Sequence, residues 1–324
     1  MKEGAPHWSS DLCKEFIADL EQRTGGRVQI QFFPGGSLSN APSMIKSIGT
    51  GITDIGLSHI SYTPGRFPVT EVCELPIGYP TGWVANQAVN DFYQKFKPKE
   101  WDKVRPLWFH ANTPSVLAST KPLRTLEDFK GVTIRAPGRM ADVIRALGGT
   151  PAPTPIMETY DAIAKGVVQG VFVGGEGIRG FRFGEIVKYV TNSWNVGPSY
   201  AFYVAMNKRS YAKLPDDIKP IFNELCGEYK EKFALGWNAA DFPGEAFGKE
   251  NGVKYIELSK DEFDRWIKAV QPVMDAYVKD MVSKGFAEAE VRGWIDFLNQ
   301  RKTQLLEKQI VLHIRSTTGP PEVR

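Results

Sequence analysis

The sequence predicts an α/β protein with two lobes, which long helices near the end of the chain could brace. Its 324 residues suit two domains, or one large α/β domain, better than a single small core. Close to the start, a strand over 27–33, a short helix over 41–49 and a second strand over 53–59 follow one another. This β-α-β order indicates a parallel sheet with helical crossovers.

The spacing of apolar residues supports each element in turn. Apolar residues at helical spacing from Leu12 to Leu20 predict a first helix, which Gly25 and Gly26 end. Alternation in 27–33 is typical of a half-buried strand. Between residues 60 and 135 we expect an extended segment at 67–80, a helix at 82–97, a strand at 104–112, a short turn or helix at 125–129 and a strand ending at Arg135. There follow a helix at 140–147, an extended loop at 151–155, a helix ending at Gly166, a buried strand at 167–175, a helical stretch at 180–188 and a strand at 199–206. The last part of the chain predicts a long helix at 214–242 with Pro243 beyond its end, two amphipathic helices at 260–284 and 287–308, and a loosely packed polar tail from His313.

Composition and charge exclude several classes of protein. The formal net charge of +3 is small and the basic residues are spread along the chain, which argues against binding of nucleic acid or an anionic membrane. The sequence has no apolar run of about 18 residues, so no transmembrane helix is predicted. The start lacks a signal-peptide pattern, which indicates either a cytosolic protein or a mature or trimmed chain.

The cysteines and histidines predict no metal site. Cys13, Cys73 and Cys226 lie far apart without a CxxC pair, so a zinc site is not expected. One disulfide with a free thiol and three buried thiols both remain open, and the apolar neighbours favour buried thiols.

Arg135 occupies a position that is typical of ligand-binding residues. The alternation of VTIR places Arg135 at the end of a strand, which Pro137 and Gly138 then stop. In open α/β sheets the carboxyl ends of strands border the ligand crevice. Arg135 is therefore a candidate for holding an anionic ligand, with an ordinary surface arginine as the alternative.

A glycine run at 175–180 matches the GxGxxG pattern and follows a strand, so a dinucleotide site is a second interpretation. The acidic residue expected roughly 20 positions later is missing, because 190–205 contains no Asp or Glu. The histidines are isolated and the sequence contains no nucleophile elbow, phosphate loop or zinc-protease motif. The sequence therefore predicts a protein that is not an enzyme and needs no cofactor.

Five segments together resemble the periplasmic solute-binding proteins of TRAP transporters, the DctP type. They are TGGRVQIQFFPGGSL (24–38), IKSIGTGITDIGLS (45–58), LEDFKGVTIRAPG (126–138), TPIMETYDAIAKGVVQG (154–170) and NKRSYAKLP (207–215). The resemblance implies two α/β lobes, each with a mostly parallel sheet flanked by helices, and a long helix that spans both. The expected division is 1–116 with 207–252 as lobe I, 117–206 with 253–310 as lobe II, and 311–324 as a polar tail.

The resemblance also implies the partners and the location of the protein. Such proteins close on a small organic acid in the periplasm and deliver it to membrane permease subunits. We therefore expect a periplasmic protein, without nucleic-acid partners and monomeric, whose signal peptide is not in the chain given. The first strand of the family is nearly missing here, which indicates a trimmed or misassigned start.

The family's site residues transfer to matching positions in this sequence. In the family the arginine of the KGxxIRxP strand pairs with the ligand carboxylate, and Arg135 matches it; a guanidinium can hold a carboxylate by two parallel hydrogen bonds. A polar asparagine of the family is replaced by Val173, and a second arginine found in sialic-acid-type relatives is replaced by Lys121. The remaining candidates are Trp8, beside His7, and His59, Tyr62, Asn112, Ile156, Trp194 and Asn195.

These residues predict an apolar, aromatic-walled cavity with one cationic end, the usual composition of small-ligand sites. The expected ligand is a small monocarboxylate with an apolar or aromatic body, and sialic acid and sugar acids are not favoured. Two alternatives remain: a nicotinamide-dependent enzyme that uses 175–180, and a ligand-sensing partner of a membrane receptor.

Overall fold

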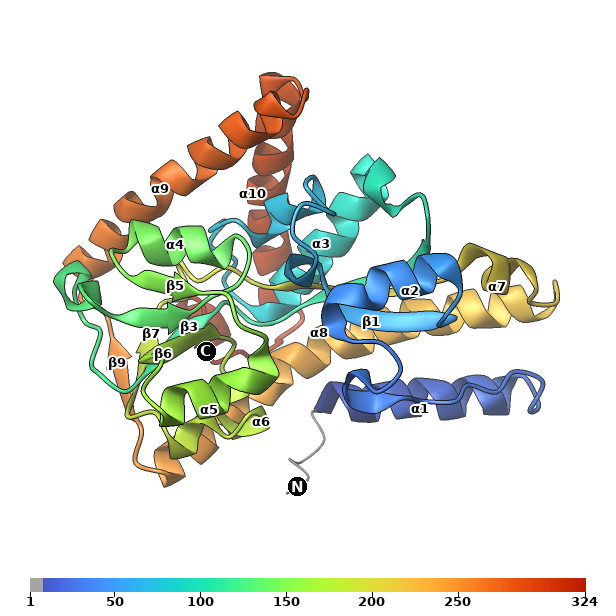
Figure 1. Cartoon of the computed structure of the whole chain (residues 1–324), viewed down its shortest axis with the longest axis horizontal. Helices are drawn as coiled ribbons and strands as arrows, with labels where there is room; N and C mark the ends of the chain where they lie inside the picture. Colours follow the sequence, from blue (N-terminus) through green and yellow to red (C-terminus); the bar gives the residue numbers. More distant parts are fainter. Residues whose placement is uncertain (1–7) are drawn as a thin grey trace.

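The computed structural model of the chain describes residues 8–324 and contains two sheets, each flanked by helices (Figure 1). The smaller sheet has the order β1-β8-β2, and the larger has the order β5-β4-β6-β3-β7-β9. The strands are β1 (Ile55–His59), β2 (Arg105–Ala111), β3 (Val116–Ser119), β4 (Thr133–Arg135), β5 (Thr150–Ala152), β6 (Gly170–Val173), β7 (Tyr189–Asn192), β8 (Ala201–Met206) and β9 (Lys254–Glu257).

The α/β class with helix-flanked sheets is confirmed, while the strand pairing is mixed where the sequence predicted mostly parallel sheets. In the smaller sheet β8 runs antiparallel to both β1 and β2. In the larger sheet β4 is parallel to β5 and β6, and β7 is parallel to β9, whereas β3 is antiparallel to β6 and β7. Both β3 and β8 follow an extended passage of the chain from one sheet to the other.

Two such passages lie side by side between the sheets. Residues 112–115 lead from β2 to β3, and residues 193–200 lead from β7 back to β8. The backbone N–H of Ser115 donates to the carbonyl of Pro198 at 3.1 Å, and the Ser193 hydroxyl donates to the carbonyl of Ser115 at 3.1 Å. A Cβ at Gly197 would clash with that same Ser115 carbonyl, so glycine is required for this close approach.

A long helix, α8 (Ile218–Glu250), runs along both lobes (Figure 1). One part packs against α1 (Trp8–Arg23), α3 (Gly82–Phe96) and β2, and its other end packs against α6 (Gly177–Gly180). Pro243 lies inside α8, so the prediction that the helix ends before it was wrong. Tight packing of the following turn on α6 maintains the helix despite the cost of an internal proline.

The two helices near the end of the chain divide between the sheets. α9 (Lys260–Ser283) packs on α4 (Met140–Ala146) beside the larger sheet, whereas α10 (Glu288–Val311) packs on α3 (Figure 1). On the α3 face, Arg301 forms an ion pair with Asp91 at 2.5 Å and the ring of Phe297 contacts Phe96. The lobe boundaries given above stay a proposal, to which this packing adds that α10 belongs with lobe I. The remaining helices are α2 (Met44–Thr50), α5 (Thr159–Ala164) and α7 (Lys208–Ala212).

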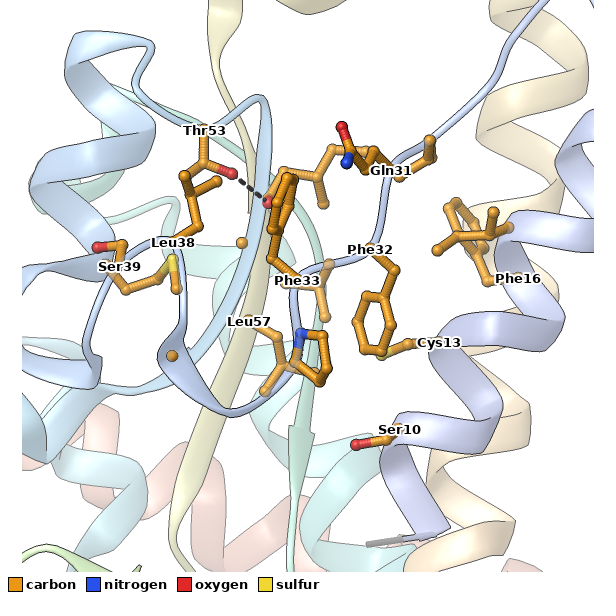
Figure 2. A pocket seen from close by; sticks show the side chains of 18 of the residues that line it. Ser10, Cys13, Phe16, Gln31, Phe32, Phe33, Leu38, Ser39, Thr53 and Leu57 are labelled. Atoms are coloured by element: carbon orange, nitrogen blue, oxygen red, sulfur yellow. Dashed lines mark hydrogen bonds between the residues drawn. The ribbon is translucent and has the colours of Figure 1, made fainter. Parts of the chain in front are cut away.

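The strand predicted over 27–33 is wrong, because this extended segment joins no sheet. Its apolar residues Val28 and Ile30 pack against the cluster around α1 and α8, which explains the alternation. A cavity of about 240 Å³ lies between this segment, α1 and β1, and Figure 2 shows side chains that line it. The predicted extended segment at 67–80 also contains a short 3-10 helix, Thr70–Glu74.

The structure bears on two expectations drawn from the sequence, the state of the cysteines and the presence of a transmembrane helix. Cys13, Cys73 and Cys226 are all free thiols, of which the last two are buried. Within residues 8–324, no helix is both long and apolar enough to cross a membrane.

The polar tail does not pack loosely, as the sequence predicted, because it takes part in a buried network at the junction of the lobes. The hydroxyls of Thr317 in the tail and Thr113 in the first passage donate to Asp241 of α8, at 3.0 and 2.9 Å. The backbone N–H of Glu176 donates to the same carboxylate at 2.7 Å. Burial raises the pKa of Asp241 to about 6.

This network predicts a pH-dependent difference in stability between the wild type and Asp241→Asn. The folded pKa of Asp241 lies above its ordinary value of 3.8, so its contribution to stability is fully present below pH 4 and is lost as the pH rises through about 6. Relative to Asp241→Asn, the wild type should therefore lose roughly 3 kcal/mol of unfolding free energy between pH 4 and pH 7.5. Urea unfolding at several pH values measures this difference, and a constant difference would contradict the assignment.

The contact between α8 and α6 predicts a second effect on stability. A Cβ at Gly244 would clash with the carbonyl of Gly175, so Gly244→Ala should destabilise the protein by about 1–3 kcal/mol. Gly227 lies exposed on the same helix with open space around it, and Gly227→Ala should stabilise by roughly 0.5–1 kcal/mol through helix propensity. Thermal unfolding measures both variants, and equal effects of the two would rule out the close contact.

Candidate functional site

A cavity of about 300 Å³ lies between the two sheets. Its walls come from both lobes and from α8, and most of the side chains are apolar or aromatic. The residues that line it are Ser9, Gly35, Leu57, His59, Tyr62, His110, Asn112, Arg135, Ile156, Met157, Val173, Glu176, Phe181, Tyr200, Phe202 and Trp237.

Arg135 supplies the positive charge of the cavity. It ends β4, which lies between β5 and β6, and only 2% of its surface is exposed. Its Nε donates to the carbonyl of Thr154 at 2.8 Å, which fixes the guanidinium. The terminal nitrogens reach only the hydroxyls of Tyr200 and Tyr62, at 3.5 and 3.4 Å, which are long for hydrogen bonds.

No carboxylate among residues 8–324 forms an ion pair with Arg135. The next arginine, Arg139, differs in this respect, because Glu71 and Asp280 bind it at 2.8 and 2.5 Å. A buried charge without a counter-ion is costly to a folded protein. The arrangement at Arg135 is therefore suited to an anion that enters from solution.

A buried carboxyl close to the arginine, that of Glu74, finds its partners within the protein. His59 Nε2 lies 2.7 Å from a carboxylate oxygen of the buried Glu74. Glu74 also accepts hydrogen bonds from the Ser61 hydroxyl and, at 2.8 Å, from the backbone N–H of Ala201. This carboxylate is thus held on the lobe I side by three donors and is turned to His59 rather than to Arg135.

Stacked rings form the wall on the α8 side. The rings of His110 and Phe202 stack at 5.0 Å with an angle of 2° between them, and Phe202 stacks on Trp237 at 5.3 Å. Trp237 Nε1 donates to His110 Nδ1 at 2.8 Å, so a neutral His110 carries its proton on Nε2. This wall offers a flat aromatic surface to a ligand.

Six of the sequence-predicted residues line the cavity: His59, Tyr62, Asn112, Arg135, Ile156 and Val173. Trp8 lies just behind the wall, where its ring contacts Trp237 at 4.9 Å. Trp194 and Asn195 lie elsewhere, since the ring of Trp194 packs on Phe263 and Asn195 Nδ2 donates to the Phe263 carbonyl at 3.3 Å. Lys121 is exposed, and His7 lies outside the described residues.

Sequence reasoning missed several lining residues, notably His110, Glu176, Phe181, Tyr200, Phe202 and Trp237. The alternation of Tyr200 and Phe202 at the start of β8 could have indicated two of them. Trp237 offered no such signal, because it lies in the middle of a long helix that reaches the cavity only through tertiary packing.

The glycine run at 175–180 serves packing rather than phosphate binding. A Cβ at Gly175 would lie 2.9 Å from the Asp241 carboxyl carbon, and one at Gly177 would lie 2.8 Å from Val173. The helix that follows, α6, has only four residues. Gly175 and Gly177 therefore let α6 approach α8 and β6, and the dinucleotide interpretation of this run was wrong.

A comparison with protein families gives one match over most of the chain. Residues 5–280 match the DctP model, described as bacterial extracellular solute-binding protein, family 7. A solute-binding protein of Albidiferax ferrireducens is 27% identical over 82% of this chain and 79% of its own length.

Solved structures give the same result. A TRAP periplasmic solute-binding protein from Desulfovibrio salexigens, an open complex with the C-terminus of a symmetry mate in its ligand-binding site, is 31% identical with a TM-score of 0.78; the match covers 89% of this chain and 90% of that one. A TRAP solute-binding protein from Rhodoferax ferrireducens with copurified benzoate is 23% identical with a TM-score of 0.84, covering 91% and 94%. The chain belongs to the DctP family, the solute-binding proteins of TRAP transporters.

Proposed function

We propose that this protein closes on a small organic monocarboxylate with an apolar or aromatic body and delivers it, as a periplasmic monomer, to a TRAP membrane permease. The observation that carries the proposal is the buried guanidinium of Arg135, which faces a cavity and has no carboxylate partner among residues 8–324.

The geometry of Arg135 favours a carboxylate over other anions of similar size. Thr154 holds Nε, so the two terminal nitrogens are left to face the cavity as a fork. A carboxylate accepts two parallel hydrogen bonds from such a fork. The tyrosine hydroxyls beside these nitrogens are at 3.4 and 3.5 Å, so a ligand has little to displace.

The walls favour a ligand body with few polar groups. Leu57, Ile156, Met157, Val173 and Phe181 present carbon to the cavity. Polyhydroxylated acids would leave hydroxyl groups without partners against these walls, at a cost of about 1–3 kcal/mol each. The cavity volume of about 300 Å³ is at the small end of ligand sites.

Similar structures support an acid as the ligand without selecting one. Besides the Rhodoferax ferrireducens protein with benzoate, a protein from Bordetella bronchiseptica of the same fold holds mandelate. Others hold orotic acid, in Desulfovibrio salexigens, and glucuronate, in Chromohalobacter salexigens. The choice of an aromatic or branched acid for this chain rests on its own walls.

The cavity also has the features that closure of the lobes requires. Met157 lines it from lobe II and is 77% exposed, so further approach of lobe I would bury it. Across the cleft, Tyr62 of lobe I is within 3.4 Å of Arg135 Nη2 and of the Ile156 N–H, and both contacts are long. These contacts would shorten on closure, which the two passages at 112–115 and 193–200 could accommodate as a hinge.

Substitution of Arg135 tests the proposal, with benzoate as the probe. Arg135→Ala removes the counter-charge of the ligand carboxylate, so the dissociation constant of benzoate should rise by about 30-fold or more. Arg135→Lys keeps the charge without the fork and should retain part of the affinity. Isothermal titration calorimetry measures the constants, and benzoate-induced thermal stabilisation gives an independent readout.

Arg145→Ala is the matched control, because Arg145 lies exposed on α4 and pairs with Asp142. It should bind benzoate as the wild type does. Wild-type binding by Arg135→Ala would disprove the assignment of Arg135 as the carboxylate anchor.

A further inference from the structure

Glu176 is the one carboxyl residue among the described residues that line the ligand cavity. It directly precedes α6, and only 5% of its surface is exposed. Its Oε2 is buried and has no hydrogen-bond partner in the described part of the chain. A buried carboxyl oxygen without a partner is costly, so its presence in a binding cavity requires an explanation.

The absence of a side chain at Gly174 determines where the Glu176 carboxyl lies. A Cβ at Gly174 would clash with Glu176 Oε2, so the side chain folds back over the glycine. The same point on Gly174 lies 2.9 Å from Asn112 Nδ2, and Asn112 is another lining residue at the end of β2. The carboxyl is thus held at the wall of the cavity near the first passage between the lobes.

Burial, and then the neighbouring charges, disfavour the charged form of Glu176. Behind it on α8 are Asp241 and Glu245, and the other titratable or charged side chains that face the cavity are Arg135, His59 and His110, with Tyr62 and Tyr200. Burial and then the nearby Asp241 carboxyl raise the pKa of Glu176 well above its usual value. No ion pair joins it to Arg135 or to another cation among residues 8–324. The raised pKa favours the carboxylic acid form of Glu176, which can donate a hydrogen bond.

We propose that Glu176 is a specificity-determining residue, which gives a hydrogen bond to a hydroxyl or carbonyl oxygen on the body of the ligand. The ligand class that follows is a monocarboxylate with one such oxygen, for example a hydroxylated aromatic acid, rather than a bare apolar acid or a polyhydroxylated sugar acid. This inference rests on the proposed function, because it needs Arg135 to hold the carboxylate end.

Glu176 would select among ligands through its buried carboxyl, which lacks a hydrogen-bond partner among residues 8–324. An unsubstituted acid leaves the buried carboxyl of Glu176 without a partner, whereas a ligand oxygen at this wall satisfies it. The terminal torsion of a glutamate side chain is soft, so the oxygen that carries the proton can turn to the cavity. A favoured hydroxylated acid should then bind roughly 10-fold more tightly than benzoate.

The test compares benzoate with 3-hydroxybenzoate, 4-hydroxybenzoate and mandelate by isothermal titration calorimetry at pH 7. In the wild type, at least one hydroxylated acid should bind roughly 10-fold more tightly than benzoate. In Glu176→Leu this preference should fall to near 1 while benzoate binding persists. Glu176→Gln should keep part of the preference, because an amide also donates, and the exposed Glu158→Gln is the control and should change nothing.

The pH dependence gives a second readout. As the pH rises above neutral the ligand carboxylate stays ionised, while ionisation of Glu176 would place a second negative charge in the cavity. Benzoate affinity should therefore fall with rising pH in the wild type and stay constant in Glu176→Gln, which also covers the case in which Glu176→Leu fails to fold.

The outcomes separate this inference from the proposed function. A wild-type preference near 1, or an unchanged preference in Glu176→Leu, would overturn the role of Glu176 while the Arg135 variants still test the anchor. Identical pH profiles for the wild type and Glu176→Gln would also overturn it. Failure of the wild type to bind any of these acids would count against both.

Discussion

The burial of one positive charge is the constraint on which the site depends. A guanidinium does not lose its proton inside a protein, so Arg135 stays charged at a position with 2% exposure. One hydrogen bond from Thr154 and two long contacts to tyrosines do not replace the water that it gives up. The folded protein therefore carries an unfavourable electrostatic free energy at β4, which a ligand carboxylate would remove in the proposed function. Recognition of a carboxylate would then follow from folding energetics as well as from shape.

The rest of the fold places other groups around that charge. β4 lies between two parallel strands of the larger sheet, so the arginine cannot withdraw from the cavity. The turn after β1 contributes Tyr62, β8 contributes Phe202, and α8 contributes Trp237. These elements meet because two extended passages and α8 connect the sheets. In the proposed function, a ligand between the lobes would contact all of them and so stabilise the closed arrangement over the open one.

The sequence was most informative where function depends on local chemistry. The place of Arg135 at the cavity could be predicted because a short alternating strand and a Pro-Gly stop fix the position of its side chain, whereas Val173, the last residue of β6, came from the family resemblance. Trp194 and Asn195, also expected at the site, do not line the cavity, since the passage they lie on faces α9 at that point. The alternation of 27–33 misled because apolar residues that pack on a helix can also recur at every second position. Pro243 misled because only tertiary packing shows why α8 continues.

The two buried carboxyls at the junction of the lobes, those of Asp241 and Glu176, have different hydrogen-bond surroundings. Asp241 accepts hydrogen bonds from Thr113, Thr317 and the Glu176 N–H, so its negative charge is compensated outside the cavity. Glu176 Oε2 has no hydrogen-bond partner among residues 8–324, and burial together with the nearby Asp241 carboxyl raises the pKa of Glu176. In the proposed role, an uncharged Glu176 would leave the positive charge of Arg135 to be neutralised by a single ligand carboxylate. The charge of the ligand would then depend on which of the two carboxyls ionises, as well as on the arginine.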